Sequence, residues 1–183
     1  DRVSQYLIRH VIYDGVSRDA PDTVLRILLF KIFNRIETWE RLTKLVGEVN
    51  RRTFHALNYG LALDLVKAEG PIYSAAYVMP QPAMGECGKH WNHLKLLAQL
   101  IDGPSQIVSR IERAGSLRDV FAALSEQPGL GDLLAYQYTI DLNYSELLHF
   151  SESSFVVAGP GAKDGIRKCF GGSIGSRSEA DVI

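Results

Sequence analysis

Two glycines in the segment Pro128-Gly129-Leu130-Gly131 give this chain its most informative candidate for chemistry. Apolar residues at helical spacing flank the segment on both sides, so we expect a helix, a tight turn and a second helix. The second helix then begins with backbone N–H groups that have no partner within the helix, at the positive end of its dipole. Such a helix start can hold one DNA phosphate without a basic side chain. The alternative interpretation is an ordinary turn between two packed helices.

A second glycine-rich segment, Gly159-Pro160-Gly161, predicts a turn at which the backbone can approach a ligand closely. A last helix is expected to begin near Ile166. Lys163 and Arg167 are four residues apart, so on a helix they share one face and can contact a phosphate. The spacing is not that of a phosphate-binding P-loop, so nucleotide hydrolysis is not predicted. A plain loop with solvated basic residues is the alternative.

The segment around residues 25–36 predicts a long amphipathic helix. Its apolar residues recur at intervals of three and four and form one stripe: Leu25, Leu28, Leu29, Ile32, Phe33 and Ile36. The other side carries polar and charged residues: Arg26, Lys31, Asn34 and Arg35. Lys31, Asn34 and Arg35 are therefore candidates for contact with a DNA backbone, and a solvated helix face is the alternative.

Three further side chains are candidates for reading or stacking on a base. The amide of Gln137 can pair with a base edge, and the rings of Tyr136 and Tyr73 can stack on a pyrimidine. Half-buried packing is the alternative for either tyrosine. His90 and His93 lie three apart with no third ligand nearby, so we predict no metal site and no other cofactor.

The elements that position these residues are helical by their periodicity and turn residues. A helix over Asn50–Glu69 is expected to bury one row of residues: Phe54, Leu57, Leu61, Leu65 and Ala68. Further helices are expected over 90–101, from a Ser105 cap to 111, from a capping box at residues 116–119, and up to about 142. Residues 72–78 form a short β-like patch, and 171–178 read as a mobile tail. The prediction is an all-α fold, one domain over residues 1–183, with a helix-hairpin-helix at about 116–142.

Composition excludes several classes of protein. The 183 residues are 46% hydrophobic and 22% charged, which is a globular balance rather than a disordered one. The formal net charge is -1, so any affinity for DNA must come from a local basic face. The two cysteines form neither a disulfide framework nor a metal-ligand spacing. We therefore expect an intracellular protein, cytoplasmic or, in a eukaryote, nuclear, with no membrane partner.

Four segments in the same order resemble a known family. Residues 127–135 resemble the hairpin of helix-hairpin-helix DNA glycosylases. Residues 28–39, residues 134–145 and residues 157–162 are similar to the family of helical domains of 5-hydroxymethyl-deoxyuridine DNA kinases and α-glutamyl/putrescinyl-thymine pyrophosphorylases. The resemblance implies a glycosylase-like helical fold that acts on hypermodified pyrimidines in phage DNA, or that excises them in defence against phage.

The sequence also departs from the family's pattern. The family continues beyond residue 183 into a polar segment, so we expect this chain to be part of a longer protein. The lysine of bifunctional glycosylases would fall at Leu133, so lyase chemistry through a Schiff base is not expected. The aspartate of glycosylases would fall near Val156–Gly159, where no carboxylate occurs.

Cleavage of an N-glycosidic bond needs a carboxylate beside the sugar, because a sugar cation develops there, and the base must first leave the stack. Asp141 is the first candidate, since it lies in a segment that resembles the family's, with Asn143 beside it as a candidate for the base pocket. Asp164 and Glu152 are weaker candidates. For Asp141 the alternative is helix-end capping or a bond to a neighbouring loop, and for the other two a solvated surface acid.

The sequence therefore predicts a monofunctional DNA glycosylase that binds double-stranded DNA and excises a hydroxymethylated or glucosylated pyrimidine after base flipping. One alternative is a transferase of the thymine pyrophosphorylase type that modifies the base in place. The other is a non-catalytic helical domain that binds DNA for an enzyme.

Overall fold

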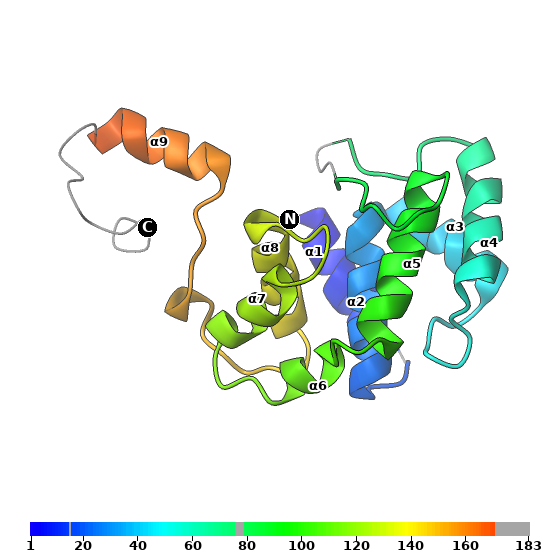
Figure 1. The fold of residues 1–183 in the computed structure, drawn as a ribbon, viewed down its shortest axis with the longest axis horizontal. Coiled ribbons are helices and arrows are strands. Elements are labelled where there is room, and N and C mark those ends of the chain that lie inside the picture. The colour runs from blue at the N-terminus through cyan, green and yellow to red at the C-terminus, as the bar shows by residue number, and fades with distance from the viewer. Residues whose placement is uncertain (15, 76–78, 171–183) are drawn as a thin grey trace.

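The computed structural model describes residues 1–14, 16–75 and 79–170, and every regular element in these ranges is a helix. The all-α prediction is confirmed. In chain order the elements are α1 (Arg2–Tyr6), the π-helical turn η1 (Leu7–Ile12), α2 (Ala20–Phe33), α3 (Ile36–Val46), α4 (Ala56–Ala68), α5 (Lys89–Asp102), α6 (Ile107–Glu112), α7 (Leu117–Ser125), α8 (Asp132–Asn143), the 3-10 turn η2 (Glu152–Ser154) and α9 (Pro160–Phe170). Figure 1 shows α2 near the centre, α4 at one edge and α9 away from the other helices. Within the described ranges, no helix is both long and apolar enough to span a bilayer.

Helix α2 is buried on nearly all sides, because it packs against η1, α5, α6 and α8. This corrects the prediction of an amphipathic helix with a charged outer face. Arg26 is only 1% exposed. Its Nε donates to the carbonyl of Val11 at 2.9 Å, and a guanidinium N–H donates to the Thr23 hydroxyl at 3.3 Å. The buried guanidinium therefore fastens η1 to the central helix.

The predicted helix over residues 25–36 divides into two. Asn34 has a left-handed backbone with φ of 46°, and its N–H donates to the carbonyl of Phe30 at 2.8 Å. This closes α2, and asparagine is one of the few residues that tolerate such a conformation. Ile36 therefore belongs to α3 and not to the stripe of α2.

Helix α4 begins at Ala56, six residues after the predicted start, and it buries the face opposite to the one predicted. Its buried residues are Tyr59, Gly60, Ala62, Leu63 and Val66. Leu57, Leu61 and Leu65 are exposed by 64%, 55% and 61%. The position of Gly60 explains the choice of face, because a Cβ there would overlap the Trp91 ring of α5. The missing side chain lets α4 and α5 approach each other.

The connection between α4 and α5 is held by side chains of α5. The Nε2–H of His93 donates to the carbonyl of Pro80 at 2.8 Å, so the Tyr73 hydroxyl donates to Nδ1 at 2.8 Å. The Asn92 amide donates to the carbonyls of Glu86 and Gly88, at 2.8 Å each. Residues 72–75 form no strand, and the rest of the predicted β-like patch lies outside the described residues.

The C-terminal third confirms one predicted helix start and corrects two. Ser116 accepts from the N–H of Asp119, whose carboxylate accepts from the Ser116 hydroxyl at 2.8 Å, as the capping box predicts. Ser105 does not cap α6, which begins after Gln106. Helix α9 begins at Pro160 and not near Ile166, because proline suits the first turn of a helix. The predicted tail at 171–178 lies outside the described residues.

Candidate nucleic-acid interface

In the turn between α7 and α8, one residue is buried in the core and the others are exposed to solvent. Leu130 is 4% exposed and belongs to the core, whereas Pro128, Gly129 and Gly131 are exposed. Gly129 has φ of +78°, and a Cβ there would lie 3.0 Å from Pro82. Glycine is required at this position for both reasons. The two helices pack closely along their length, so the predicted order of helix, turn and helix is present.

The first turn of α8 carries no side-chain cap. Gly131 is its N-cap residue, and a Cβ on it would meet nothing within 4 Å. The backbone N–H groups of this turn therefore donate no hydrogen bond to a side chain of the N-cap residue. Asp132 lies in the same turn and occupies part of the positive end of the helix dipole.

Helix α9 begins beside this turn. A Cβ built on Gly159 would lie 3.1 Å from Cδ1 of Leu133, so the residue before α9 touches the first turn of α8. Gly159 and Gly161 do not form the predicted glycine-rich turn, because the chain is already helical from Pro160. Lys163 and Arg167 are exposed and lie one turn apart on this helix. Two helix starts and two basic side chains thus lie in one region.

Asp141 is buried in the interface between α8 and α2. Its carboxylate is 2.8 Å from the ammonium of Lys31, and the side chains are 6% and 13% exposed. Burial raises the pKa of the Asp141 carboxyl, and the Lys31 ammonium opposes that rise. Lys31 therefore does not offer an exposed charge to a DNA backbone, and Asp141 pairs with it across the interface between α2 and α8.

Asn143 closes a loop and does not face an open pocket. Its Nδ2 donates to the carbonyl of Phe150 at 2.9 Å, and its Oδ1 accepts from the N–H of Phe150 at 3.2 Å. Both ends of the amide are thus engaged. The alternative role for Asp141 was a hydrogen bond to a neighbouring loop. In the structure Asn143 makes such a bond.

Beside this loop, the structure brings Tyr136 and Glu152 together with Tyr144. Burial and then the Glu152 carboxylate raise the pKa of both tyrosines. The Tyr136 ring lies 6.1 Å from the ring of Phe155, which also packs against Phe121. We call Tyr136, Tyr144, Glu152 and Phe155 the α8 aromatic cluster. It is half-buried apart from the exposed Glu152, and Gln137, also half-buried, follows Tyr136 on the same helix.

Tyr73 lies apart from this cluster. Its hydroxyl is bonded to His93, its ring packs at 5.1 Å from Phe33, and the Lys89 ammonium lies 4.4 Å from the ring centroid. Tyr73 is therefore half-buried and packed, which was the alternative to base stacking for this residue. Asp164 also lies apart, on α9, where it pairs with Lys168 at 2.7 Å.

Asn34 and Arg35 lie at the corner between α2 and α3. They line a shallow cavity of about 200 Å³ together with Arg2 and Ser74. Nε of Arg35 is 3.4 Å from the Glu37 carboxylate, so part of its charge is already balanced. The structure separates this pair from Lys31, which the sequence had grouped with it.

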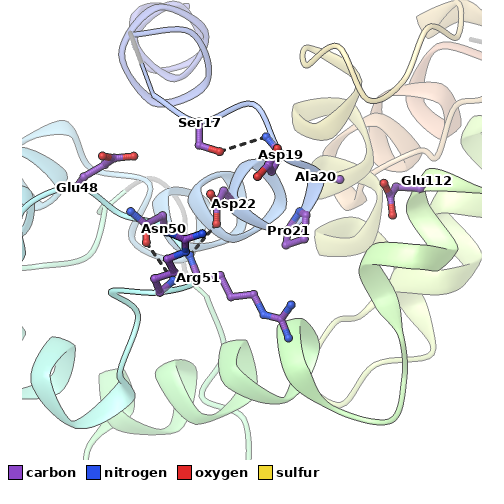
Figure 2. A pocket seen from close by; sticks show the side chains of 10 residues that line it. Ser17, Asp19, Ala20, Pro21, Asp22, Glu48, Asn50, Arg51 and Glu112 are labelled. Atoms are coloured by element: carbon purple, nitrogen blue, oxygen red, sulfur yellow. Dashed lines mark hydrogen bonds between the residues drawn. The ribbon is translucent and has the colours of Figure 1, made fainter.

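A wide cavity of about 930 Å³ lies where α2 begins (Figure 2), and no predicted site residue lines it. Its charged lining consists of Asp19, Asp22, Glu48, Glu112, Arg51 and Arg52. The Arg51 guanidinium is paired with Asp102 at 2.7 Å. The remaining lining is mainly acidic and repels phosphate, so it does not suit DNA. The acids come from three separate segments, so no motif could have revealed the cavity.

Taken together, the described fold is all-helical, and the residue before the basic helix α9 touches the first turn of α8. Among the described residues no group of three or more His, Cys, Asp or Glu side chains could hold a metal ion. The chain belongs to the family described as 5-hmdU DNA kinase, helical domain, which matches residues 1–183. This confirms the resemblance to that family, and it associates the domain with an enzyme that modifies DNA. Neither the curated proteins nor the solved structures contain a match.

Proposed function

We propose that this domain binds double-stranded DNA that carries 5-hydroxymethyluracil and holds it for enzymatic modification of the base. The observation that carries the proposal is the meeting of the α8 and α9 starts at Leu133 and Gly159, with Lys163 and Arg167 on the exposed side of α9. Backbone N–H groups there donate hydrogen bonds to one phosphate, and the two basic side chains donate to the next.

The α8 aromatic cluster is the part of this region suited to a base. Tyr136 offers an aromatic ring, and Gln137 offers an amide for a base edge. Glu152 can accept a hydrogen bond from a hydroxymethyl group, which thymine lacks. Loss of such a bond disfavours the unmodified base.

A binding titration tests the proposal. Fluorescence anisotropy with duplexes that differ only in thymine or 5-hydroxymethyluracil should give tighter binding to the modified duplex. Gly131→Val places a branched side chain before the α8 start without a clash, so it should weaken binding to both duplexes. Gly115→Val, before α7, is the matched control and should bind like the wild type. Equal affinity of the wild type and Gly131→Val for DNA would contradict the proposal that the start of α8 binds a phosphate.

Excision of the base is the second candidate, and the sequence prediction of a carboxylate at the sugar supports it. Of the three predicted acids, Glu152 is exposed and lies beside Tyr136. Alkali treatment of the bound duplexes would convert abasic sites to strand breaks. Breaks at 5-hydroxymethyluracil that Glu152→Gln abolishes would establish excision, whereas intact strands with binding retained favour the DNA-holding role.

A further inference from the structure

Arg118 is an exposed basic side chain at the edge of the α8 aromatic cluster. It lies in the first turn of α7. Its guanidinium carbon is 5.0 Å from the centroid of the Phe155 ring, and that ring also packs at 5.2 Å from Phe121 of the same helix. Arg118 is therefore held against the cluster although it does not belong to the core.

The charge of Arg118 is available for a ligand. Within the described ranges no carboxylate forms an ion pair with it, whereas Arg110 of α6 pairs with Glu126 at 2.7 Å. The carboxylate of the next residue, Asp119, belongs to the capping box and accepts from the Ser116 hydroxyl. A guanidinium that stacks on a ring keeps its N–H edge for a second partner, and the stacking already limits its rotamers. Arg118 can therefore bind an anion at a small cost in side-chain entropy.

Arg118 and the start of α9 lie on opposite sides of the cluster. Helices α7 and α8 are joined by a short turn and pack along their length, so they run in opposite directions. Phe121 and Tyr136 face each other across this pair, since one phenylalanine ring packs against both. Arg118 comes three residues before Phe121, toward the start of α7. Leu133, where the residue before α9 meets α8, comes three residues before Tyr136. The two positions are thus roughly 9 Å apart along the helix axes, with the rings between them.

This spacing suits the two phosphates of a single nucleotide. A nucleotide whose base lies at Tyr136 has one phosphate on each side of its sugar, and donors for a phosphate are present on each side of Tyr136. Glu152 is the exposed acid of the cluster, and its charge disfavours a phosphate beside it. The backbone of the bound strand is therefore expected to pass by Arg118 and the helix starts rather than by Glu152.

We propose that Arg118 binds the phosphate on one side of the modified nucleotide, while the starts of α8 and α9 bind the phosphate on the other side. This inference rests on the proposed function, because it assigns a further contact within the same interface. Phosphate contacts fix the position of a strand and carry no sequence information. Arg118 is therefore a positioning residue that does not select the base.

The salt dependence of binding tests the contact. Arg118→Gln should lower the slope of log affinity against log salt by about 0.9, equally for thymine and 5-hydroxymethyluracil duplexes. Arg118→Lys keeps the charge and should keep the slope. Arg113→Gln removes another exposed arginine, five residues earlier, and is the matched control that should leave the slope unchanged. A merely structural role against Phe155 would change the melting temperature and not the slope, so an unchanged slope in Arg118→Gln overturns the proposal.

Neutral phosphates test the placement on two sides. Each duplex carries one 5-hydroxymethyluracil, with an uncharged methylphosphonate in place of the phosphate on its 5′ side, on its 3′ side or on neither. The wild type should bind both neutralised duplexes roughly fivefold more weakly. Arg118→Gln should lose this difference on one side only, and Gly131→Val should lose it on the other side only.

The outcomes separate this inference from the proposed function. If Arg118→Gln keeps the full difference on both sides, or if both variants lose it on the same side, the inference is wrong and the binding of duplex DNA by the domain stands. A wild type that binds none of the duplexes overturns the proposed function and this inference with it.

Discussion

The buried pair of Lys31 and Asp141 shows that a carboxylate can be interpreted as a catalytic acid or as part of a structural ion pair. From the sequence alone, the Asp141 carboxylate near the end of its helix was interpreted as a candidate catalytic acid. In the structure the same carboxylate is 2.8 Å from a lysine ammonium on the central helix, and both side chains are almost sealed from water. The pair joins α2 to α8, so its first effect is on stability.

Asp141→Asn should lower the free energy of unfolding by about 3–5 kcal/mol, because it removes the carboxylate that balances the buried Lys31 charge. The double variant Lys31→Met with Asp141→Leu should recover most of that loss. Urea denaturation of the three proteins measures both effects. If Asp141→Asn kept full stability and lost only turnover, the structural account of this pair would be wrong.

His93 gives the domain a pH dependence. Burial lowers the pKa of His93 from 6.5 to about 4, so the unfolded chain binds a proton between these values that the folded chain does not. Stability is therefore full above about pH 6.5 and falls as the pH drops toward 4, by roughly 3 kcal/mol for this shift. Unfolding midpoints measured across this range should lose much of their slope in His93→Gln. An unchanged slope would assign the effect to other groups.

At the scale of helices, the contact between α4 and α5 depends on the absence of a side chain at Gly60. Gly60→Ala should destabilise the fold by about 1–3 kcal/mol, because the added Cβ would overlap the Trp91 ring. Gly165→Ala is the control, since a Cβ there meets nothing within 4 Å. Thermal melting compares them, and equal melting temperatures would contradict this packing.

Sequence patterns predicted most helices but not the buried face of α4. The capping box at Ser116 and the stop after Asp102 depend on neighbouring residues, so they could be read correctly. The two apolar faces of α4 could not be ranked, because the choice depends on Trp91, some thirty residues away in another helix. The break at Asn34 was missed since the apolar spacing continues across it.

In the candidate site, too, local spacing could be predicted and long-range contacts could not. Lys163 and Arg167 share a helix face as their spacing predicts. The burial of Asp141 and the loop closure by Asn143 come from long-range packing that no local pattern contains. The contact of Gly159 with Leu133 joins two segments that the sequence analysis treated separately.

At the scale of the whole molecule, α4 and α9 lie at opposite ends. Helix α4, with the exposed side chains of Leu57, Leu61 and Leu65, is at one edge and α9 at the other (Figure 1). The acidic cavity at the start of α2 is lined in part by residues 48–52, which connect α3 to α4. The candidate DNA interface is therefore confined to the end of the molecule that carries α9.

The salt dependence of DNA binding tests the central claim most directly. Each phosphate neutralised by a basic side chain contributes about 0.9 to the slope of log affinity against log salt. Replacing both Lys163 and Arg167 by glutamine should therefore lower the slope by nearly two while the fold is retained. Lys44→Gln with Lys67→Gln, on α3 and α4, is the matched control and should leave the slope unchanged. A slope that is the same in wild type and the α9 variant would contradict the proposed interface.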